Sequence, residues 1–311
     1  MKGLELAEKY YNEYGSKMIK SKFPELEDKL AIGLVGSGSE CFGYDDDISQ
    51  DHDFEPGFCI FIPDESVIDE KTAFQLSREY SKLPSQFMGF KRAKMSPVGG
   101  NRHGVIRTAD FYNSKCGRAD GGLSSLEWLH VPEFSLAEAV NGTVFIDNLG
   151  EFTGIRQILK YYPEDIRRKK LAGNLLLMAQ SGQYNYMRCV ERKEYAAAQL
   201  AMHNFTTAAL HTIFLLNGKY MPYYKWCFRA LKDLEKLSNL YDSLEYLISS
   251  DNEGNKSQTK SEMIEDIAAL VIKEIKAYGI TDAVCNDLEK HAYSVNDHIS
   301  DGILRNMDIF L

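Results

Sequence analysis

The sequence has no long apolar run, no paired cysteine motif and no excess of basic residues. No stretch approaches the roughly 20 apolar residues that cross a bilayer, and its acidic N-terminus does not resemble a secretory leader. The six cysteines include no C-x-x-C pair, which excludes a disulfide framework and a thiolate zinc site. The net charge of −9 argues against broad binding to a phosphate backbone, but not against a local pocket for one nucleotide. We therefore expect a soluble, cytoplasmic protein without a membrane segment.

The composition is that of an ordinary globular protein. The chain has 311 residues, of which 44% are hydrophobic and 26% charged. At roughly 150 residues per domain, this length accommodates two hydrophobic cores. Strand and helix patterns alternate up to about residue 150, and only helical patterns follow. The sequence therefore predicts an α+β fold with one domain over residues 1–150 and an all-α domain over 151–311.

Hydrophobic periodicity predicts the individual elements. In the first half we expect helices over 4–20, 70–83, 124–130 and 135–140, and strands over 31–35, 57–62, 104–112 and 142–146. In the second half we expect helices over 155–162, 164–181, 184–216, 223–249 and 262–278, with a flexible loop over 251–260.

Residues 36–53 combine a glycine turn with an acidic pair. The turn follows a buried strand, and Asp51 and Asp53 precede the next apolar run. Alternate residues of an extended chain share a side, so these carboxylates could hold Mg²⁺ together. Bare N–H groups at a glycine turn that leads into a helix could hold a triphosphate. Asp110, late in the third predicted strand, is our candidate for a third carboxylate.

The residues of this segment also allow other sites to be considered. Glu127 or Asp147 could replace Asp110 as the third carboxylate. An EF-hand fails because the glycine at position 6 and the final glutamate are absent, and a Walker P-loop fails because no G-K-[ST] follows the glycines. The ligand set of His-Asp hydrolases needs an earlier histidine, yet His52 is the first in the chain. A solvated acidic loop is the remaining structural alternative, although an apolar run directly after the acidic pair disfavours it.

Gly38-Ser39 followed by Asp51-x-Asp53 resembles the signature of the DNA-polymerase-beta-like nucleotidyltransferase superfamily. The longer string GSECFGYDDDISQDHD, residues 38–53, resembles a bacterial branch catalogued as a domain of unknown function and related to the kanamycin-type nucleotidyltransferases. Two further segments of this chain resemble a second signature of that branch: SGQYNYMR at 181–188 and LLNGKYMPYYKW at 215–226. Together the two signatures lie within about residues 30–235.

The resemblance implies a small mixed-sheet nucleotidyltransferase domain and a helical domain that closes over the nucleotide. It implies transfer of a nucleoside monophosphate from a triphosphate, with ATP expected, to an acceptor hydroxyl. Gly38 and Ser39 would hold the phosphates. Asp51, Asp53 and Asp110 would bind Mg²⁺, or alternatively Mn²⁺, and form the catalytic set. The acceptor is expected to be a small molecule, with tRNA or a protein left open.

The helical half contributes further candidate nucleotide contacts. Tyr184 and Arg188 share a helix face at i, i+4 spacing, with Asn185 beside them, and arginine offers fixed donors to phosphate. Lys225 beside Trp226 would place an ammonium next to an aromatic wall. The structural alternative is that these aromatic residues are core and that the arginine is solvated. The dense basic run at residues 167–170 is expected to be a solvated helix end, or else a rim that attracts an anionic substrate.

Two other classes of function remain open. The same site could hold a nucleotide without chemistry, in a sensor or a toxin–antitoxin-type module. Alternatively, the chain could be a helical interaction protein whose acidic cluster has no ligand. A metal-dependent nucleotidyltransferase remains the leading hypothesis.

Overall fold

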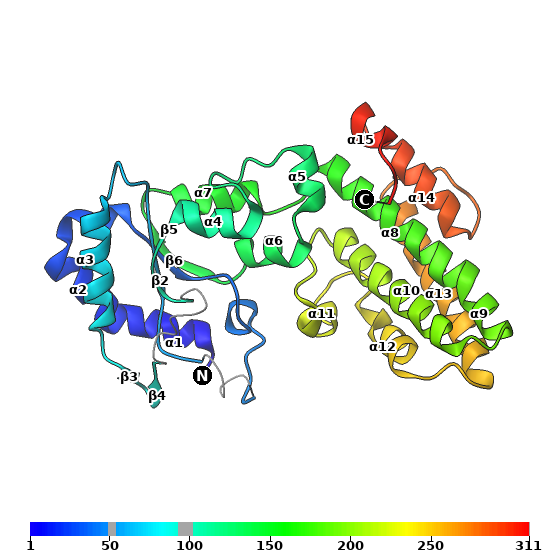
Figure 1. Cartoon of the computed structure of the whole chain (residues 1–311), viewed down its shortest axis with the longest axis horizontal. Helices are drawn as coiled ribbons and strands as arrows, with labels where there is room; N and C mark the ends of the chain where they lie inside the picture. The colour runs from blue at the N-terminus through cyan, green and yellow to red at the C-terminus, as the bar shows by residue number, and fades with distance from the viewer. Residues whose placement is uncertain (49–53, 93–101, 311) are drawn as a thin grey trace. The chain divides into compact units, whose positions relative to one another are not determined.

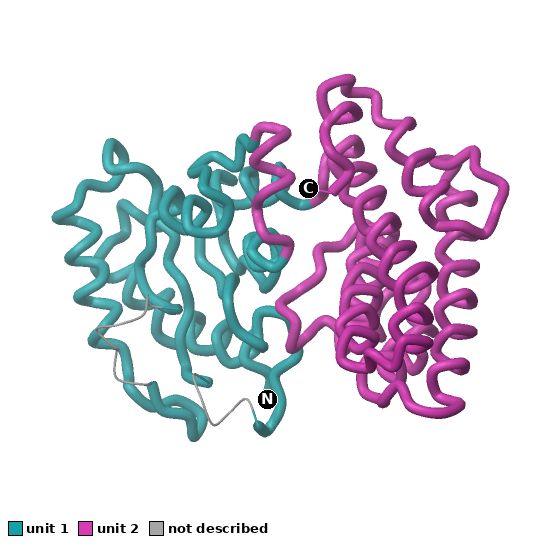
Figure 2. Tube along the Cα trace, turned by 45° about the vertical axis from the view of Figure 1, so that its right-hand side comes forward, with its two compact units in different colours: residues 1–123, 134–160 teal, residues 124–133, 161–311 magenta. Residues whose placement is uncertain are grey.

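The structure is a computed structural model that describes residues 1–48, 54–92 and 102–310. It divides into two compact units, shown in different colours in Figure 2. The first comprises Met1–Leu123 and Phe134–Lys160, and the second comprises Ser124–Glu133 and Tyr161–Leu311. Residues 151–160, which the change of pattern placed in the second domain, therefore belong to the first unit. No helix among the described residues is long and apolar enough to cross a membrane.

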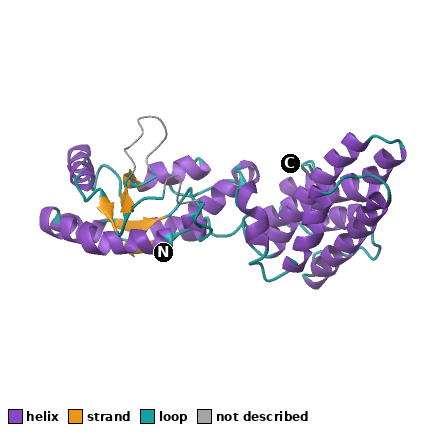
Figure 3. Ribbon diagram, turned by 90° about the horizontal axis from the view of Figure 1, so that it is seen from below, coloured by secondary structure: helices purple, strands orange, loops and turns teal. Residues whose placement is uncertain are grey.

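A four-stranded mixed sheet forms the centre of the first unit, confirming the α+β class (Figure 3). Its order is β5-β2-β1-β6, with β1 antiparallel to both neighbours and β2 parallel to β5. The strands are β1 (Ala31–Leu34), β2 (Cys59–Ile62), β5 (Gly104–Arg107) and β6 (Thr143–Asp147). Every residue of β1 and β2 is buried, which explains their uninterrupted apolar sequences.

A glycine allows the edge strand β6 to approach β1. The register between them shifts at Gly33, where an added Cβ would lie 2.5 Å from the carbonyl oxygen of Thr143. Any larger side chain would push the backbone of β6 away. The edge strand predicted over 142–146 is therefore confirmed, and its pairing depends on a residue in the middle of another strand.

Helices cover the sheet of the first unit (Figure 1). Helices α1 and α2 form one continuous helical segment with a single π-helical turn between them, confirming the predicted N-terminal helix. The helical elements are α1 (Gly3–Tyr10), η1 (Tyr11–Gly15), α2 (Ser16–Lys22), η2 (Pro24–Lys29), η3 (Glu40–Phe42), α3 (Glu70–Ser81), α4 (Thr108–Cys116), α6 (Glu133–Val140) and α7 (Glu151–Ile158). A short hairpin joins β3 (Gln86–Phe87) to β4 (Phe90–Lys91).

The third strand is shorter than predicted, and this changes the position of Asp110. The strand β5 ends at Arg107, and helix α4 begins at Thr108. Thr108, Phe111 and Tyr112 are buried at helical spacing, so tertiary burial of this face favours a helix over the predicted strand. The prediction that Asp110 lies late in a strand was wrong, because Asp110 lies in the first turn of α4.

The second unit contains no strand in its described residues, 124–133 and 161–310. The longest helices, α8, α10 and α13, enclose a core that includes Leu175, Phe205 and Ile267. The helical elements are α5 (Ser125–His130), α8 (Glu164–Met178), η5 (Ala179–Tyr186), α9 (Met187–Glu191), α10 (Tyr195–Leu216), α11 (Tyr224–Leu231), η6 (Ser238–Leu240), α12 (Tyr241–Ser249), α13 (Asn255–Ala277), α14 (Leu288–Asp297) and α15 (Gly302–Asn306).

Three expectations about the second unit were wrong. The helices expected over 184–216 and 223–249 are each interrupted. The first is broken at Lys193, which adopts a left-handed conformation. Helix α13 begins at Asn255, inside the predicted flexible loop, because Ser257 and Lys260 are buried against the unit. Polar residues in core-facing positions conceal the periodicity that marks a helix.

The basic run at residues 167–170 is not a solvated helix end. Lys169 is 1% exposed, and its ammonium donates to Asn296 Oδ1 (2.9 Å) and to the carbonyl of Met307 (2.7 Å). Arg168 donates to the carbonyl of His298 (2.7 Å). These cations therefore fasten the C-terminal segment onto α8.

Candidate functional site

The turn after β1 has a fixed backbone. Gly36 and Gly38 have φ angles of +101° and +126°, which other residues rarely adopt. The side chain of Asn141 accepts from the N–H of Gly36 (2.8 Å) and donates to its carbonyl (2.7 Å). One amide thus holds both polar groups of the first glycine. The turn is therefore set in place by α6 and the residues that follow it.

Two cations bind this turn from distant parts of the first unit. Lys115 Nζ donates to Ser37 Oγ (3.2 Å) and to Glu138 Oε2 (2.5 Å). Arg102 Nη2 donates to the carbonyl of Ser37 (2.9 Å) and forms an ion pair with the buried Glu40. The predicted glycine turn is therefore bound by two cations, each of them paired with a glutamate. The sequence alone did not reveal them, because neither cation lies near the turn in the chain.

Gly38 and Ser39 occupy a tight junction between β1 and η3. A Cβ added to Gly38 would lie 1.8 Å from Arg102 Nη2, which would have to move, and the φ of +126° would strain any other residue at this position. The carbonyl of Ser39 accepts from the N–H groups of Phe42 (3.1 Å) and Tyr44 (2.8 Å). The turn leads into only three 3₁₀-helical residues, so the expectation of a helix end as a source of positive potential was wrong.

A cleft of about 670 Å³ brings Asp110 together with the glycine turn. The cleft contains both cations, Arg102 and Lys115, and Asp110 is exposed. Its lining also includes exposed and apolar side chains of α3 and β5, among them Phe74, Val105 and Ile106. One end of the cleft can therefore attract an anion, and the rest can take an apolar group.

The acidic residues of the first unit have different surroundings. Asp51 and Asp53 lie outside the described residues. Asp45 is 4% exposed, and its Oδ2 accepts from the N–H of Gly3 (2.9 Å), so it caps α1. Asp147 accepts from the N–H groups of Gly150 (3.0 Å) and Thr153 (2.7 Å) at the start of α7. The described part of the chain contains no group of three or more His, Cys, Asp or Glu side chains placed to hold a metal ion.

Glu127, the other alternative third carboxylate, belongs to the second unit. It forms a reciprocal capping box with Ser124 at the start of α5. Of the three candidates that sequence reasoning proposed, Asp110 is the one that lines the cleft with the glycine turn.

In the second unit, several residues of the SGQYNYMR motif have structural roles. The motif lies in the π-helical segment η5 and the start of α9. A Cβ on Gly182 would lie 2.3 Å from the ring of Phe205, so this glycine permits close packing of η5 on α10. Tyr186 is fully buried and donates to Asn252 Oδ1 (3.0 Å). These residues fasten the segment to α10 and to the residues before α13.

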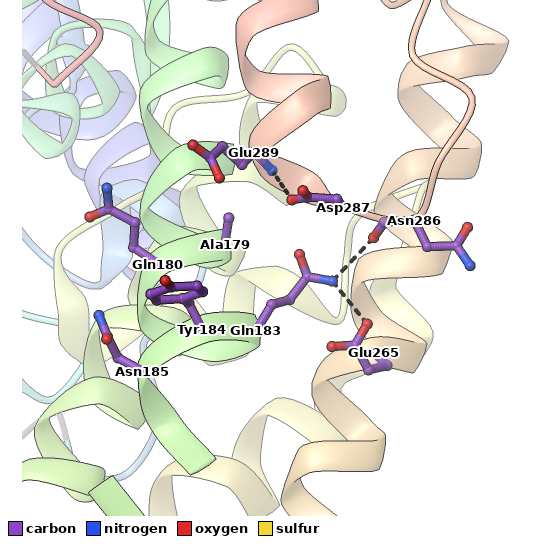
Figure 4. A pocket seen from close by; sticks show the side chains of 9 residues that line it. All are labelled: Ala179, Gln180, Gln183, Tyr184, Asn185, Glu265, Asn286, Asp287 and Glu289. Atoms are coloured by element: carbon purple, nitrogen blue, oxygen red, sulfur yellow. Dashed lines mark hydrogen bonds between the residues drawn. The ribbon is translucent and has the colours of Figure 1, made fainter. Parts of the chain in front are cut away.

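Gln183 ties the same segment to two other parts of the second unit (Figure 4). Its Nε2 donates to Glu265 Oε2 (2.9 Å) and to the carbonyl of Asn286 (3.1 Å). Its Oε1 accepts from the N–H of Leu288 (3.0 Å) at the start of α14. A single amide therefore joins η5, α13 and α14.

Tyr184 and Asn185 line a pocket of about 750 Å³ beside this amide (Figure 4). Tyr184 is 58% exposed, and the guanidinium of Arg188 lies 3.5 Å from the centre of its ring, as the i, i+4 spacing predicted. The carboxylates of Glu265, Asp287 and Glu289 also line the pocket. Its described lining has no basic side chain. A triphosphate would need cations such as Arg188 to offset this charge.

The second part of the motif also combines structure with exposed groups. Asn217 donates to the carbonyls of Ile213 (2.8 Å) and Lys236 (3.0 Å), joining the end of α10 to a later loop. Tyr220 packs edge-on against Tyr162, with ring centres 4.8 Å apart. Lys225 is exposed, and its Nζ lies 5.2 Å from the centre of the Trp226 ring, so the predicted ammonium beside an aromatic wall is present.

Comparison with known proteins gives one match. A family model described as a domain of unknown function (DUF4037) matches residues 128–227, about a third of the chain. It covers η5, α10 and both parts of the second motif, but not the glycine turn or the acidic pair. No curated protein and no solved structure matches the chain.

Proposed function

We propose that this protein is a metal-dependent nucleotidyltransferase that moves a nucleoside monophosphate from a triphosphate to an acceptor hydroxyl. The observation that carries the proposal is the cleft of the first unit. There a rigid glycine turn, two cations and an exposed aspartate lie around one cavity. This combination suits a phosphate group better than a neutral ligand.

The described side chains suggest how the triphosphate is held. Arg102 and Lys115 both bind the turn through Ser37, which lines the cleft together with Gly36, so they would lie beside phosphates at this turn. Gly38 and Ser39 do not line the cleft and would contact the phosphates only from the adjoining backbone. Glu40 and Glu138 position these cations. The apolar end of the cleft would leave room for the nucleoside.

The metal ions would be held by Asp51, Asp53 and Asp110. Of these ligands the structure describes Asp110, whose exposed carboxylate lines the cleft and is a hard oxygen donor of the kind that Mg²⁺ prefers. When bound, the ions would neutralise the charge that develops on the phosphate oxygens. ATP is the expected substrate, and Mn²⁺ is the alternative ion.

In the proposed reaction, the acceptor oxygen attacks the α-phosphorus in line. A new bond forms between that oxygen and the phosphorus, the bond to the bridging oxygen of the β-phosphate breaks, and pyrophosphate leaves. The hydroxyl proton would pass to a carboxylate, for which Asp110 is the described candidate. In the second unit, Tyr184, Asn185, Arg188 and Lys225 would contribute nucleotide contacts.

The test measures pyrophosphate release and transfer of labelled nucleotide with Mg²⁺ and each of the four triphosphates. The acceptor source is a mixture of cell metabolites, tRNA and protein. Asp51→Asn with Asp53→Asn should abolish both signals, and Lys115→Met should weaken binding of the triphosphate. The matched control is Asp147→Asn, since Asp147 caps α7 and does not line the cleft.

Each outcome decides between the functions. Pyrophosphate release that depends on the acidic pair supports the transferase. Saturable nucleotide binding without any labelled product supports the sensor. The absence of both binding and turnover would contradict the transferase and the sensor alike. Unchanged turnover in the double variant would remove Asp51 and Asp53 from the mechanism.

A further inference from the structure

A second cleft, of about 530 Å³, lies within the second unit and shares no residue with the cleft of the first. Its walls come from the end of α5 and the residues that follow it, from α8, from α10 and from Phe310. Much of the lining is apolar, including Leu129, Leu177 and Leu215. The cavity is large enough for a small molecule and has an apolar wall to receive one.

Lys170 places a cation at this cleft without a carboxylate partner. Its Nζ donates to the carbonyl of Leu129 (2.9 Å) and lies 5.3 Å from the centre of the Tyr162 ring. No carboxylate of the described residues lies within ion-pair distance of it. Burial lowers the pKa of Lys170, an effect that the nearby Glu133 only partly offsets. A ligand with a negative charge would compensate this ammonium.

A histidine held by a buried carboxylate provides a second polar group. The Glu133 side chain is nine-tenths buried, and its Oε2 contacts Nδ1 of His211. An ionised carboxylate only accepts, so the proton of that contact belongs to Nδ1. In this tautomer Nε2 of His211 is an acceptor. Nε2 has no hydrogen-bond partner among the described residues, and His211 lines the cleft.

We propose that this cleft binds a small monocarboxylate with an apolar body. The carboxylate would pair with Lys170, and the body would lie on the leucine side chains. One charge is specified because the lining offers a single unpaired ammonium. A phosphate dianion would place its second charge near the buried Glu133, at an electrostatic cost.

Tryptophan fluorescence offers a local readout in the full-length protein. The chain has two tryptophans, and Trp128 packs against Tyr162 (5.7 Å between ring centres), the ring that Lys170 covers. Trp226→Phe leaves Trp128 as the sole reporter. The probes are cyclohexanecarboxylate, its neutral amide and cyclohexyl phosphate, which do not absorb at the excitation wavelength.

The carboxylate should change the Trp128 emission saturably, with at least about tenfold higher affinity than the amide. Lys170→Met should abolish that preference, whereas Lys170→Arg should retain it. Lys219→Met is the matched control, since Lys219 is an exposed lysine of the same unit that does not line the cleft. Equal affinity for acid and amide, tighter binding of the phosphate, absence of a saturable signal, or an unchanged preference in Lys170→Met would each overturn the proposal.

Discussion

At the scale of single residues, similar side chains near the glycine turn have different roles. Asp45 lies in the same acidic segment of the sequence as Asp51 and Asp53, the predicted metal ligands. Asp45 instead accepts from the first N–H of α1 and lies near the ammonium of Lys2 (3.5 Å). A carboxylate at a helix N-terminus stabilises that helix. The sequence could not show this role, because the partner lies 42 residues away in the chain.

Two helical glycines should respond in opposite ways to alanine. In Gly182→Ala the new methyl group would meet the Phe205 ring at 2.3 Å. We therefore expect overpacking to lower the free energy of unfolding by about 1–3 kcal/mol. In Gly154→Ala nothing lies within 4 Å, and alanine's higher helix propensity should add up to about 1 kcal/mol. Urea denaturation of both variants measures the difference. Equal effects of the two substitutions would contradict the packing argument.

The buried Lys260 should make the stability depend on alkaline pH. It is fully buried, donating to the carbonyl of Ser250 (2.7 Å) and to Asn252 Oδ1 (3.0 Å), and burial lowers its pKa from 10.5 to about 8. Between pH 8 and 10.5, Lys260 is protonated in the unfolded chain and neutral in the folded protein. The free energy of unfolding should therefore gain on the order of 1 kcal/mol per pH unit from this group between pH 8 and 10.5.

The comparison of wild type with Lys260→Met isolates this effect. Buried tyrosines with raised pKa values act in the opposite direction at high pH, but they are common to both proteins. Denaturation at several pH values should show that the wild type gains stability relative to the variant from pH 8 upward. A constant difference between the two proteins across this range would show that Lys260 does not titrate there.

At the scale of elements, apolar runs predicted the structure where burial is uniform. Strands β1 and β2 are buried throughout, so their sequences alone identified them. Helix α4 was missed because its buried face, Thr108, Phe111 and Tyr112, begins directly after a strand. The start of α13 was missed because a buried lysine and serine occupy core positions. In both cases tertiary burial, not local propensity, determines the element.

The cap of α7 allows a structural acid to be separated from the proposed catalytic acid. Asp147→Ala removes the acceptor for two N–H groups and the hydroxyl of Thr153 at the start of α7, and should cost about 1 kcal/mol of stability. Asp110→Asn, at an exposed position, should leave stability nearly unchanged. Pyrophosphate release should show the opposite order: Asp110→Asn should lose activity, and Asp147→Ala should retain it. Thermal unfolding measures the stability of both variants. A stable but inactive Asp147→Ala variant would move the proposed third carboxylate to that position.

At the scale of the whole molecule, the chain order does not follow the compact units. Residues 124–133 belong with the helical unit, where Trp128 packs on Tyr162 and the carbonyl of Leu129 accepts from Lys170. The composition change near residue 150 reflects the end of the strands, and it carries no information on these contacts. The candidate site was likewise predictable only in part from the sequence. The motif makes Gly38 a candidate from the sequence alone, whereas Arg102 and Lys115 required the fold, since they lie 65 and 78 residues beyond Ser37.

Hydrogen exchange with and without Mg²⁺ and ATP can test whether both units contribute to one nucleotide site. The proposed function places phosphates at the turn of the first unit and further contacts at Tyr184 and Arg188 of the second. Backbone amides of residues 34–38 and 184–188 should therefore both exchange more slowly when the nucleotide is bound. The control region is α2, whose residues line neither the cleft of the first unit nor the pocket beside Tyr184.

The double variant Asp51→Asn, Asp53→Asn should lose the Mg²⁺-dependent part of this protection. Protection confined to residues 34–38 would leave the nucleotide site in the first unit and remove Tyr184, Asn185 and Arg188 from it. That result would fit the acidic lining of the pocket beside Tyr184, where three carboxylates oppose a bound triphosphate. Protection of 184–188 would instead require the cation of Arg188 to outweigh those charges, because an anion cannot approach this lining without compensation.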